Sequence, residues 1–161
     1  MSALAEARLQ PGDVLPQLQG KYLSGREATL PADARGKYAL LAFGFTYDSR
    51  FPVEAWGKEY DRRYKNNPQI TFYEIPMISG FGRLAAPFID SGMRKGTPKD
   101  KYENVITVYG GAGSWKKALG VGDEKTAYLV LLDPEGTIRW MSKGPPSPEA
   151  FEALGRIVSG K

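Results

Sequence analysis

The sequence contains no cysteine and no histidine in 161 residues. Without thiols, the chain can form no disulfide, offers no thiolate to a metal or an iron–sulfur cluster, and has no thiolate nucleophile for peroxide chemistry. Without imidazole, it lacks the usual general base near neutral pH and the usual histidine of a catalytic triad. It also has no apolar run close to the roughly 20 residues that a membrane-spanning helix needs. Any function must therefore rely on other groups.

What is present is the composition of one globular domain, with 42% hydrophobic and 25% charged residues. We expect a flexible lead-in over residues 1–13 and a single domain over residues 14–161. The lead-in includes Ala3-Leu4-Ala5, a pattern typical of the end of an export leader. It favours an extracytoplasmic location, periplasmic or membrane-associated after leader removal. A frayed Ala-rich terminus of a cytoplasmic protein would have the same pattern.

The formal net charge of +4 arises from Lys and Arg residues that are interleaved with Asp and Glu. This mild excess is consistent with an acidic partner or an anionic membrane surface, and it gives little support to nucleic-acid binding. Some acidic residues stand close together in the sequence, but they lack the further ligands that would converge on a metal ion. Some turns are rich in glycine, but they lack the lysine at the spacing that a phosphate-binding loop requires. We therefore expect no metal and no cofactor.

Apolar patterning predicts strands that alternate with helices along most of the chain. Residues 38–45 form the strongest strand, because their near-continuous apolar character suits burial on both faces. Residues 133–136 are a turn signal, and Ser147-Pro148 predicts the cap and first turn of a final helix. The expected elements are a hairpin within 15–30, strands 38–45, 70–75, 105–109, 128–132 and 137–140, and helices 52–66, 84–93 (starting late or kinked at Pro87), 114–119 (capped by Ser114) and from 147 onward. This order indicates an α/β fold.

The beginning of the sequence resembles the opening of exported thioredoxin-like and peroxiredoxin-like proteins. The residues that carry this resemblance are Gly12-Asp13-Val14-Leu15-Pro16, Gly25 and Gly36-Lys37. Residues 105–149 resemble the closing half of the same superfamily. The resemblance implies an extended thioredoxin-like fold of the peroxiredoxin and TlpA type. That fold has a central mixed sheet, helices on both faces and an N-terminal hairpin.

In such proteins the catalytic cysteines follow the strand that corresponds here to residues 38–45. Residues 43–47 resemble the strand that leads into the copper-binding cysteines of the Sco family, with Asp48 and Pro52 near the cysteine positions. Alternatively, residues 46–49 resemble the peroxiredoxin T-x-x-C motif, with Ser49 in the peroxidatic place. The usual cis-proline position falls near Thr126-Ala127, where this chain has no proline. The resemblance therefore implies a scaffold without its redox groups.

Four further segments resemble the mitochondrial ATP synthase assembly-factor ten family and its bacterial relatives. They are residues 75–78, 88–98, 104–109 and 131–140. This resemblance implies a cysteine-poor thioredoxin-like protein that aids assembly of the membrane sector of an F-type ATP synthase.

Residues 47–51, which we name the edge loop, lie beyond the carboxyl end of the predicted central strand, where α/β sheets usually place their sites. The loop offers an acid, a base, a hydroxyl and two aromatic rings, a mixture suited to protein recognition. Asp48 or Ser49 could instead simply cap the following helix, and Arg94 could simply complement a helix dipole. The predicted partner-binding residues are Tyr47, Asp48, Ser49, Arg50, Phe51, Met77, Arg94 and Trp140.

We therefore expect a non-catalytic thioredoxin-like binding or assembly protein for a respiratory or ATP synthase complex, with a subunit of that membrane complex as its protein partner. One alternative is an enzyme with non-thiol chemistry at Asp48, Ser49 and Arg50, although no base is in place to activate the serine. The other is a structural subunit of a redox complex.

Overall fold

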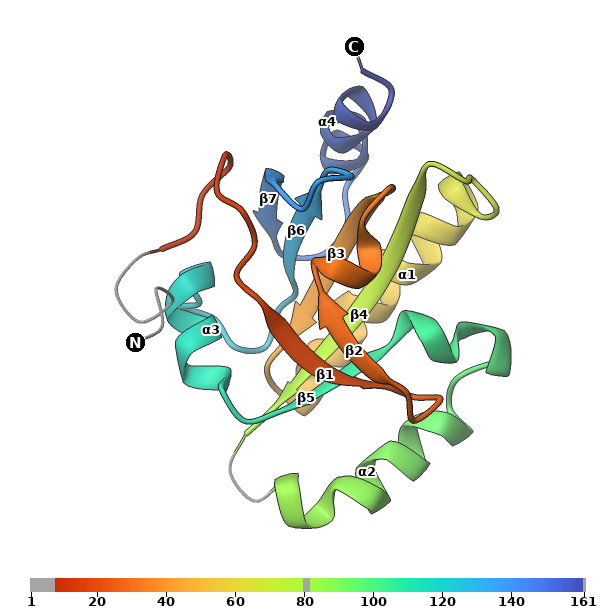
Figure 1. Cartoon of the computed structure of the whole chain (residues 1–161), viewed down its shortest axis with the longest axis vertical. Coiled ribbons are helices and arrows are strands. Elements are labelled where there is room, and N and C mark those ends of the chain that lie inside the picture. Colours follow the sequence, from red (N-terminus) through yellow and green to blue (C-terminus); the bar gives the residue numbers. More distant parts are fainter. Residues whose placement is uncertain (1–7, 80–81, 161) are drawn as a thin grey trace.

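The computed structural model describes residues 8–79 and 82–160, and its centre is one seven-stranded sheet (Figure 1). The strand order is β2-β1-β5-β4-β3-β6-β7. Strands β3, β4 and β5 are parallel, and the outer strands join them in antiparallel pairs. The strands are β1 Leu18–Tyr22, β2 Glu27–Leu30, β3 Tyr38–Gly44, β4 Ile70–Ile78, β5 Ile106–Tyr109, β6 Tyr128–Leu132 and β7 Ile138–Lys143. The predicted mixed sheet and N-terminal hairpin are confirmed.

Helices cover both faces of this sheet, as predicted. The apolar residues of α1 and α4 pack into one core, and those of α3 pack into a second core on the opposite face (Figure 1). The α-helices are α1 Arg50–Tyr64, α2 Gly82–Lys95, α3 Ala112–Leu119 and α4 Pro148–Val158, and the 3₁₀ turns are η2 Ala32–Ala34, η3 Tyr47–Ser49 and η4 Lys99–Asn104. Among the described residues, no helix combines the length and the apolar character needed to cross a bilayer.

Strand β3 lies at the centre of both cores because its side chains alternate between them. Leu41 and Phe43 belong to the α3 side, Leu40 and Ala42 belong to the α1 side, and all four are fully buried. A strand flanked by β4 and β6 and covered on both faces has no solvent-facing side, so an almost wholly apolar sequence is required. This burial fixes the carboxyl end of β3, from which the edge loop leaves.

Helix boundaries agree with the sequence where capping signals are local. Ser147 caps α4, because its side chain accepts a hydrogen bond from the backbone N–H of Ala150 at 3.1 Å. The other boundaries need correction. Helix α3 begins at Ala112, with Gly111 at the N-cap position at φ 76° in place of Ser114, a left-handed conformation that favours glycine. Helix α2 begins at Gly82 and includes Pro87, so the expected late start is wrong.

The segment before β1 is attached to the domain. The backbone N–H of Leu9 donates to Ala118 O at 2.8 Å, and that of Gly12 donates to Ile138 O at 2.8 Å. Backbone groups that are hydrogen-bonded to two separate elements are held in place. The expectation of a flexible lead-in is therefore wrong for residues 9–13, and residues 1–7 lie outside the described residues.

Candidate functional site

The edge loop begins where β3 ends and forms the 3₁₀ turn η3 before α1 starts. Thr46 stands before this turn in an extended conformation. Its Oγ1 donates to the carbonyl oxygen of Glu124 at 3.0 Å. This bond joins the edge loop to the segment that precedes β6, which contains Thr126 and Ala127. The edge loop and the segment that leads into β6 therefore lie side by side, and neither contains a cysteine or a proline.

Ser49 is a structural residue of this loop. Its side chain is buried, donates to Thr46 O at 2.6 Å and accepts from Thr46 N at 3.3 Å. The strand residue Gly44 leaves the necessary space, because a Cβ atom there would lie 2.6 Å from Ser49 Oγ. The structure therefore buries Ser49, which was predicted as a partner-contact residue. The alternative that its side chain caps the following helix is wrong, because Ser49 stands at the N-cap position of α1 without a side-chain capping hydrogen bond and bonds to Thr46 instead. A buried hydroxyl already engaged with backbone is also a poor nucleophile.

Two aromatic rings and one guanidinium make up the exposed part of the loop. Tyr47 and Phe51 are 78% and 60% exposed. The guanidinium carbon of Arg50 lies 3.5 Å from the centroid of the Tyr47 ring and 4.0 Å from that of Phe51. Its Nη1 also donates to Tyr47 O at 2.8 Å. We name Tyr47, Arg50 and Phe51 the aromatic clamp, and the exposed Asp48 lies within it in sequence.

Cation–π contacts at exposed sites are each worth about 0.5–1 kcal/mol. They hold the two rings against a charged group that remains partly accessible. The clamp and the neighbouring Asp48 therefore present apolar surface, a cation and a carboxylate at the carboxyl end of β3.

Two other predicted contact residues lie within the packed domain. Met77 is 2% exposed and belongs to the core on the α3 side, because it points inward from β4. Trp140 is half-buried in the middle of β7, and its ring packs edge-to-face on Trp56 of α1 at 6.3 Å. The prediction of Met77 as a surface contact is therefore wrong. Trp140, also predicted as a partner-binding residue, packs within the domain on Trp56.

Arg94 makes no described contact with the clamp. It is in the last turn of α2, and its carbonyl oxygen accepts from the Tyr102 hydroxyl of η4 at 3.0 Å. Gly96 and Thr97, which follow it closely in sequence, line a groove that runs along α1 from Glu54 to Lys65. Among the described residues, no hydrogen bond, ion pair or cation–π contact joins Arg94 to the edge loop. The expectation that Arg94 acts together with the edge loop stays a prediction.

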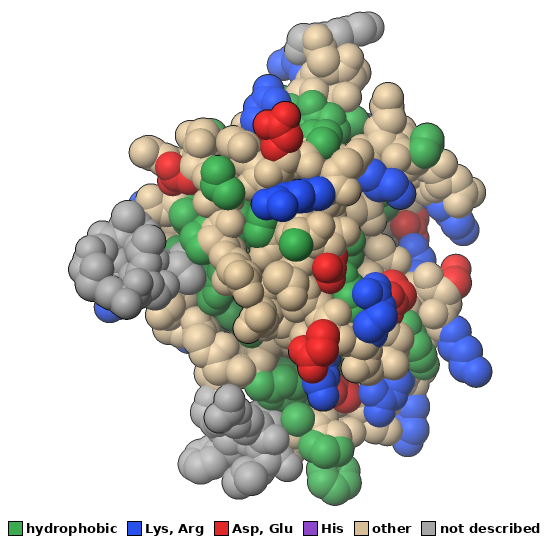
Figure 2. Space-filling view, in the orientation of Figure 1, with side chains coloured by type: hydrophobic (Ala, Val, Ile, Leu, Met, Phe, Trp, Pro, Cys, Tyr) green, Lys and Arg blue, Asp and Glu red, His purple; other side chains and the backbone are tan. Residues whose placement is uncertain are grey.

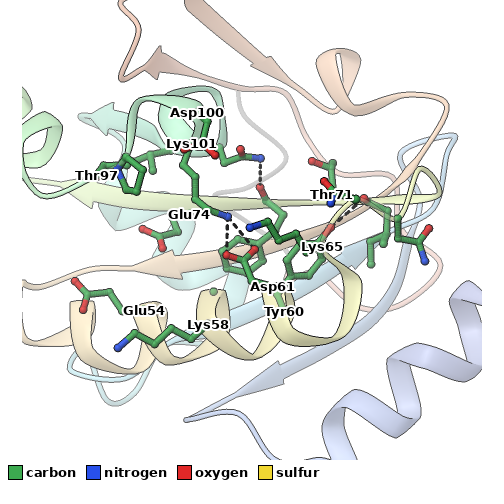
Figure 3. Close-up of a pocket in the computed structure, with 18 of the residues that line it drawn as sticks. Glu54, Lys58, Tyr60, Asp61, Lys65, Thr71, Glu74, Thr97, Asp100 and Lys101 are labelled. Atoms are coloured by element: carbon green, nitrogen blue, oxygen red, sulfur yellow. Dashed lines mark hydrogen bonds and ion pairs between the residues drawn. The ribbon is translucent and has the colours of Figure 1, made fainter.

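A second site was missed by sequence reasoning. A groove of about 610 Å³ lies between α1 and the segment 96–104, over the amino-terminal half of β4 (Figure 3). Glu74 of β4 lines it, and burial raises the pKa of this carboxyl to about 7, with a smaller contribution from the negative charge of Glu54. The available signal was one acidic residue within the otherwise uncharged strand Ile70–Ile78.

Comparisons with solved structures place the fold among thioredoxin-like proteins. The chain resembles the thioredoxin domain of a thiol-disulfide oxidoreductase from Bacteroides vulgatus with 23% identity, a TM-score of 0.60 and coverage of 93% of this chain and 99% of that one. A thiol:disulfide interchange protein from Bacteroides sp. matches with 23% identity and a TM-score of 0.61, covering 94% and 91% of the two chains. A thiol peroxidase from Chromobacterium violaceum matches with 12% identity and a TM-score of 0.59, covering 96% and 88%.

At these identities the likeness establishes the fold alone, and the predicted thioredoxin-like fold is confirmed. No curated protein matches the sequence significantly. The family model described as ATP10 protein matches residues 10–160, which confirms the resemblance drawn from the four sequence segments. This cysteine-less, thioredoxin-like chain belongs to the ATP10 protein family.

Proposed function

We propose that this protein is a non-catalytic assembly factor that binds a subunit of the membrane sector of an F-type ATP synthase. Membership of the ATP10 family supports the link to the ATP synthase. The lack of every cysteine supports a binding role, because the redox chemistry of thioredoxin-like proteins requires a thiolate. The interleaved Lys, Arg, Asp and Glu side chains on the face seen in Figure 2 suit a protein partner better than nucleic acid.

The aromatic clamp is the observation that carries this proposal. Tyr47 and Phe51 expose most of their side chains beyond the carboxyl end of β3, where α/β sheets usually place their sites. Tyrosine, phenylalanine and arginine are enriched at protein interfaces, and exposed apolar surface beside charged groups marks such sites. Because Arg50 already holds both rings, part of the ordering entropy of binding is removed in advance. The clamp is therefore suited to anchor a partner.

The hydrogen bonds of Ser49 favour this proposal over the enzymatic alternative. Its hydroxyl is bonded to Thr46, and the neighbouring guanidinium of Arg50 is stacked between two rings. Within the described residues, no hydrogen bond or ion pair joins either side chain to the exposed Asp48 in a shared reaction centre. Peptide or subunit recognition requires no such centre.

Co-purification tests the proposal. The chain is tagged in its native host, and ATP synthase membrane-sector subunits are quantified after mild cross-linking. We expect Tyr47→Ala combined with Arg50→Ala to lower their recovery at least tenfold. The matched control is Phe88→Ala with Arg156→Ala, which removes an equally exposed aromatic ring on α2 and a surface arginine on α4.

Equal recovery with both double variants would contradict the role of the clamp. Recovery of subunits of a redox complex, with none from the ATP synthase, would favour the alternative of a structural subunit.

We also propose an extracytoplasmic location, from the Ala3-Leu4-Ala5 pattern. A fusion to a reporter enzyme that is active only after export tests it, and an inactive reporter would contradict it.

A further inference from the structure

The groove that contains Glu74 is shaped by a glycine on its α1 wall. Glu74 is on β4, opposite Ala42 of β3, and it faces α1. A Cβ atom at Gly57 would lie 3.3 Å from Glu74 Oε1, closer than most carbon atoms approach, so the glycine leaves the carboxylate uncovered on that side. Beside it, the floor is apolar, with Ile70 and Phe72 almost fully buried. The groove therefore joins an apolar floor to one carboxylate.

The carboxylate has no cationic partner. Within the described residues, no hydrogen bond or ion pair reaches Glu74. Lys101 of η4 extends over the groove but pairs with Asp61 of α1, Nζ to Oδ2 at 2.6 Å (Figure 3). Lys58 and Lys65 are on the exposed rim.

Glu54 and Asp61, both on α1, add negative charge near Glu74, and only Lys101 opposes them. A half-buried carboxylate without a partner is costly when ionised. A cation from outside would remove that cost.

The chemistry of the groove selects an organic cation over a metal ion. No group of three or more acidic, histidine or cysteine side chains comes together in the described part of the chain to hold a metal. A volume of about 610 Å³ is in the range of ligand sites and large enough for a long side chain. Lysine and arginine bury an apolar stem and carry a terminal charge, which matches an apolar floor that ends at a carboxylate.

We propose that this groove receives a lysine or arginine side chain of a protein partner, with Glu74 as its counterion. The inference rests on the proposed function only in that the occupant is a protein. It adds a second contact region beside the middle of α1, at Gly57, whereas the aromatic clamp stands at the first turn of that helix. The two regions together would let one partner lie along α1.

The test uses the isolated protein and a small probe. The pKa of Glu74 is measured by NMR titration of labelled glutamate side chains, with and without N-acetyl-arginine amide. The neutral citrulline derivative of the same shape is the control probe. A cation that binds only the ionised carboxylate at about ten times its Kd lowers the pKa by about one unit. We expect this shift with the arginine probe and none with citrulline.

Variants test whether the effect belongs to the groove. The probe should also shift the backbone amide signals of Gly57 and Phe72 in a saturable way. Glu74→Gln should abolish that saturation, whereas Glu152→Gln, an exposed acid on α4, should leave it intact. Gly57→Ala should weaken it by crowding the carboxylate.

The same pKa with both probes, or saturation that survives Glu74→Gln, would overturn the inference. These outcomes are independent of ATP synthase co-purification, so failure of the groove proposal and failure of the proposed function are distinguishable.

Discussion

Replacing Glu74 with glutamine should make the fold more stable at alkaline pH and remove a pH dependence. In the folded protein the pKa of Glu74 is about 7, against an ordinary value of 4.5. The folded state therefore holds the proton more tightly than the unfolded chain. The stability that protonated Glu74 contributes is fully present below about pH 4.5 and is lost as the pH rises through 7. Glutamine resembles the protonated carboxyl and does not titrate.

The size of the effect follows from the pKa difference. At 1.36 kcal/mol for each unit, full ionisation of Glu74 destabilises the fold by up to roughly 3 kcal/mol. Burial of the carboxyl contributes most to the raised pKa. Among the charged groups facing it, Glu54 and Asp61 of α1 oppose its ionisation, and Lys101 of η4 favours it. The absence of histidine leaves few other groups that titrate between pH 5 and 8.

Urea denaturation at several pH values between 5 and 8 provides the assay. The free energy of unfolding of the wild-type protein should fall over this range, and that of Glu74→Gln should stay nearly level. The two should agree near pH 5 and differ most near pH 8, where the variant is more stable. Glu152→Gln on the surface of α4 is the matched control and should follow the wild type. Parallel curves for wild type and Glu74→Gln across the whole range would refute the reasoning.

Three further changes probe the elements that support the site. Ser49→Ala should lower the free energy of unfolding by about 1 kcal/mol in urea denaturation, because both hydrogen bonds to Thr46 are lost; an unchanged midpoint would contradict a structural role. Gly44→Ala should destabilise the fold more strongly, since the new Cβ meets Ser49 Oγ, and adding Ser49→Ala should relieve part of the loss. Strictly additive effects would argue against this contact. Ser147→Ala should cost about 1 kcal/mol through loss of the bond from the Ala150 N–H, measured by thermal unfolding.

Much of the fold could be predicted because its signals are local. The apolar run of β3 and the Ser147-Pro148 cap of α4 act through neighbouring residues, and both appear in the structure as expected. The start of α3 was misplaced because glycine in a left-handed conformation, and not the serine, stands at its N-cap. Backbone conformation at a glycine is set by the path of the chain on either side, which a local pattern does not record.

The candidate site was predicted only in part, because exposure depends on distant segments. Of the edge loop, Tyr47 and Phe51 are exposed, whereas Ser49 is buried by bonds to Thr46. Met77 was predicted at the surface but is buried. The face of β4 to which its side chain points, and the segment that covers that face, depend on the order and register of all the strands in the sheet. Such facts become available only when strand order and register are known.

The sequence alone determined what this protein cannot do. A chain without cysteine has no thiolate in any conformation, and this holds whatever its fold. Only the tertiary structure decided which polar groups are accessible and which are buried. It put Glu74 opposite Gly57 in a groove where no described ion pair reaches its carboxylate. The physical reason is that desolvation and charge pairing depend on distances in space, and folding sets those distances between residues far apart in sequence.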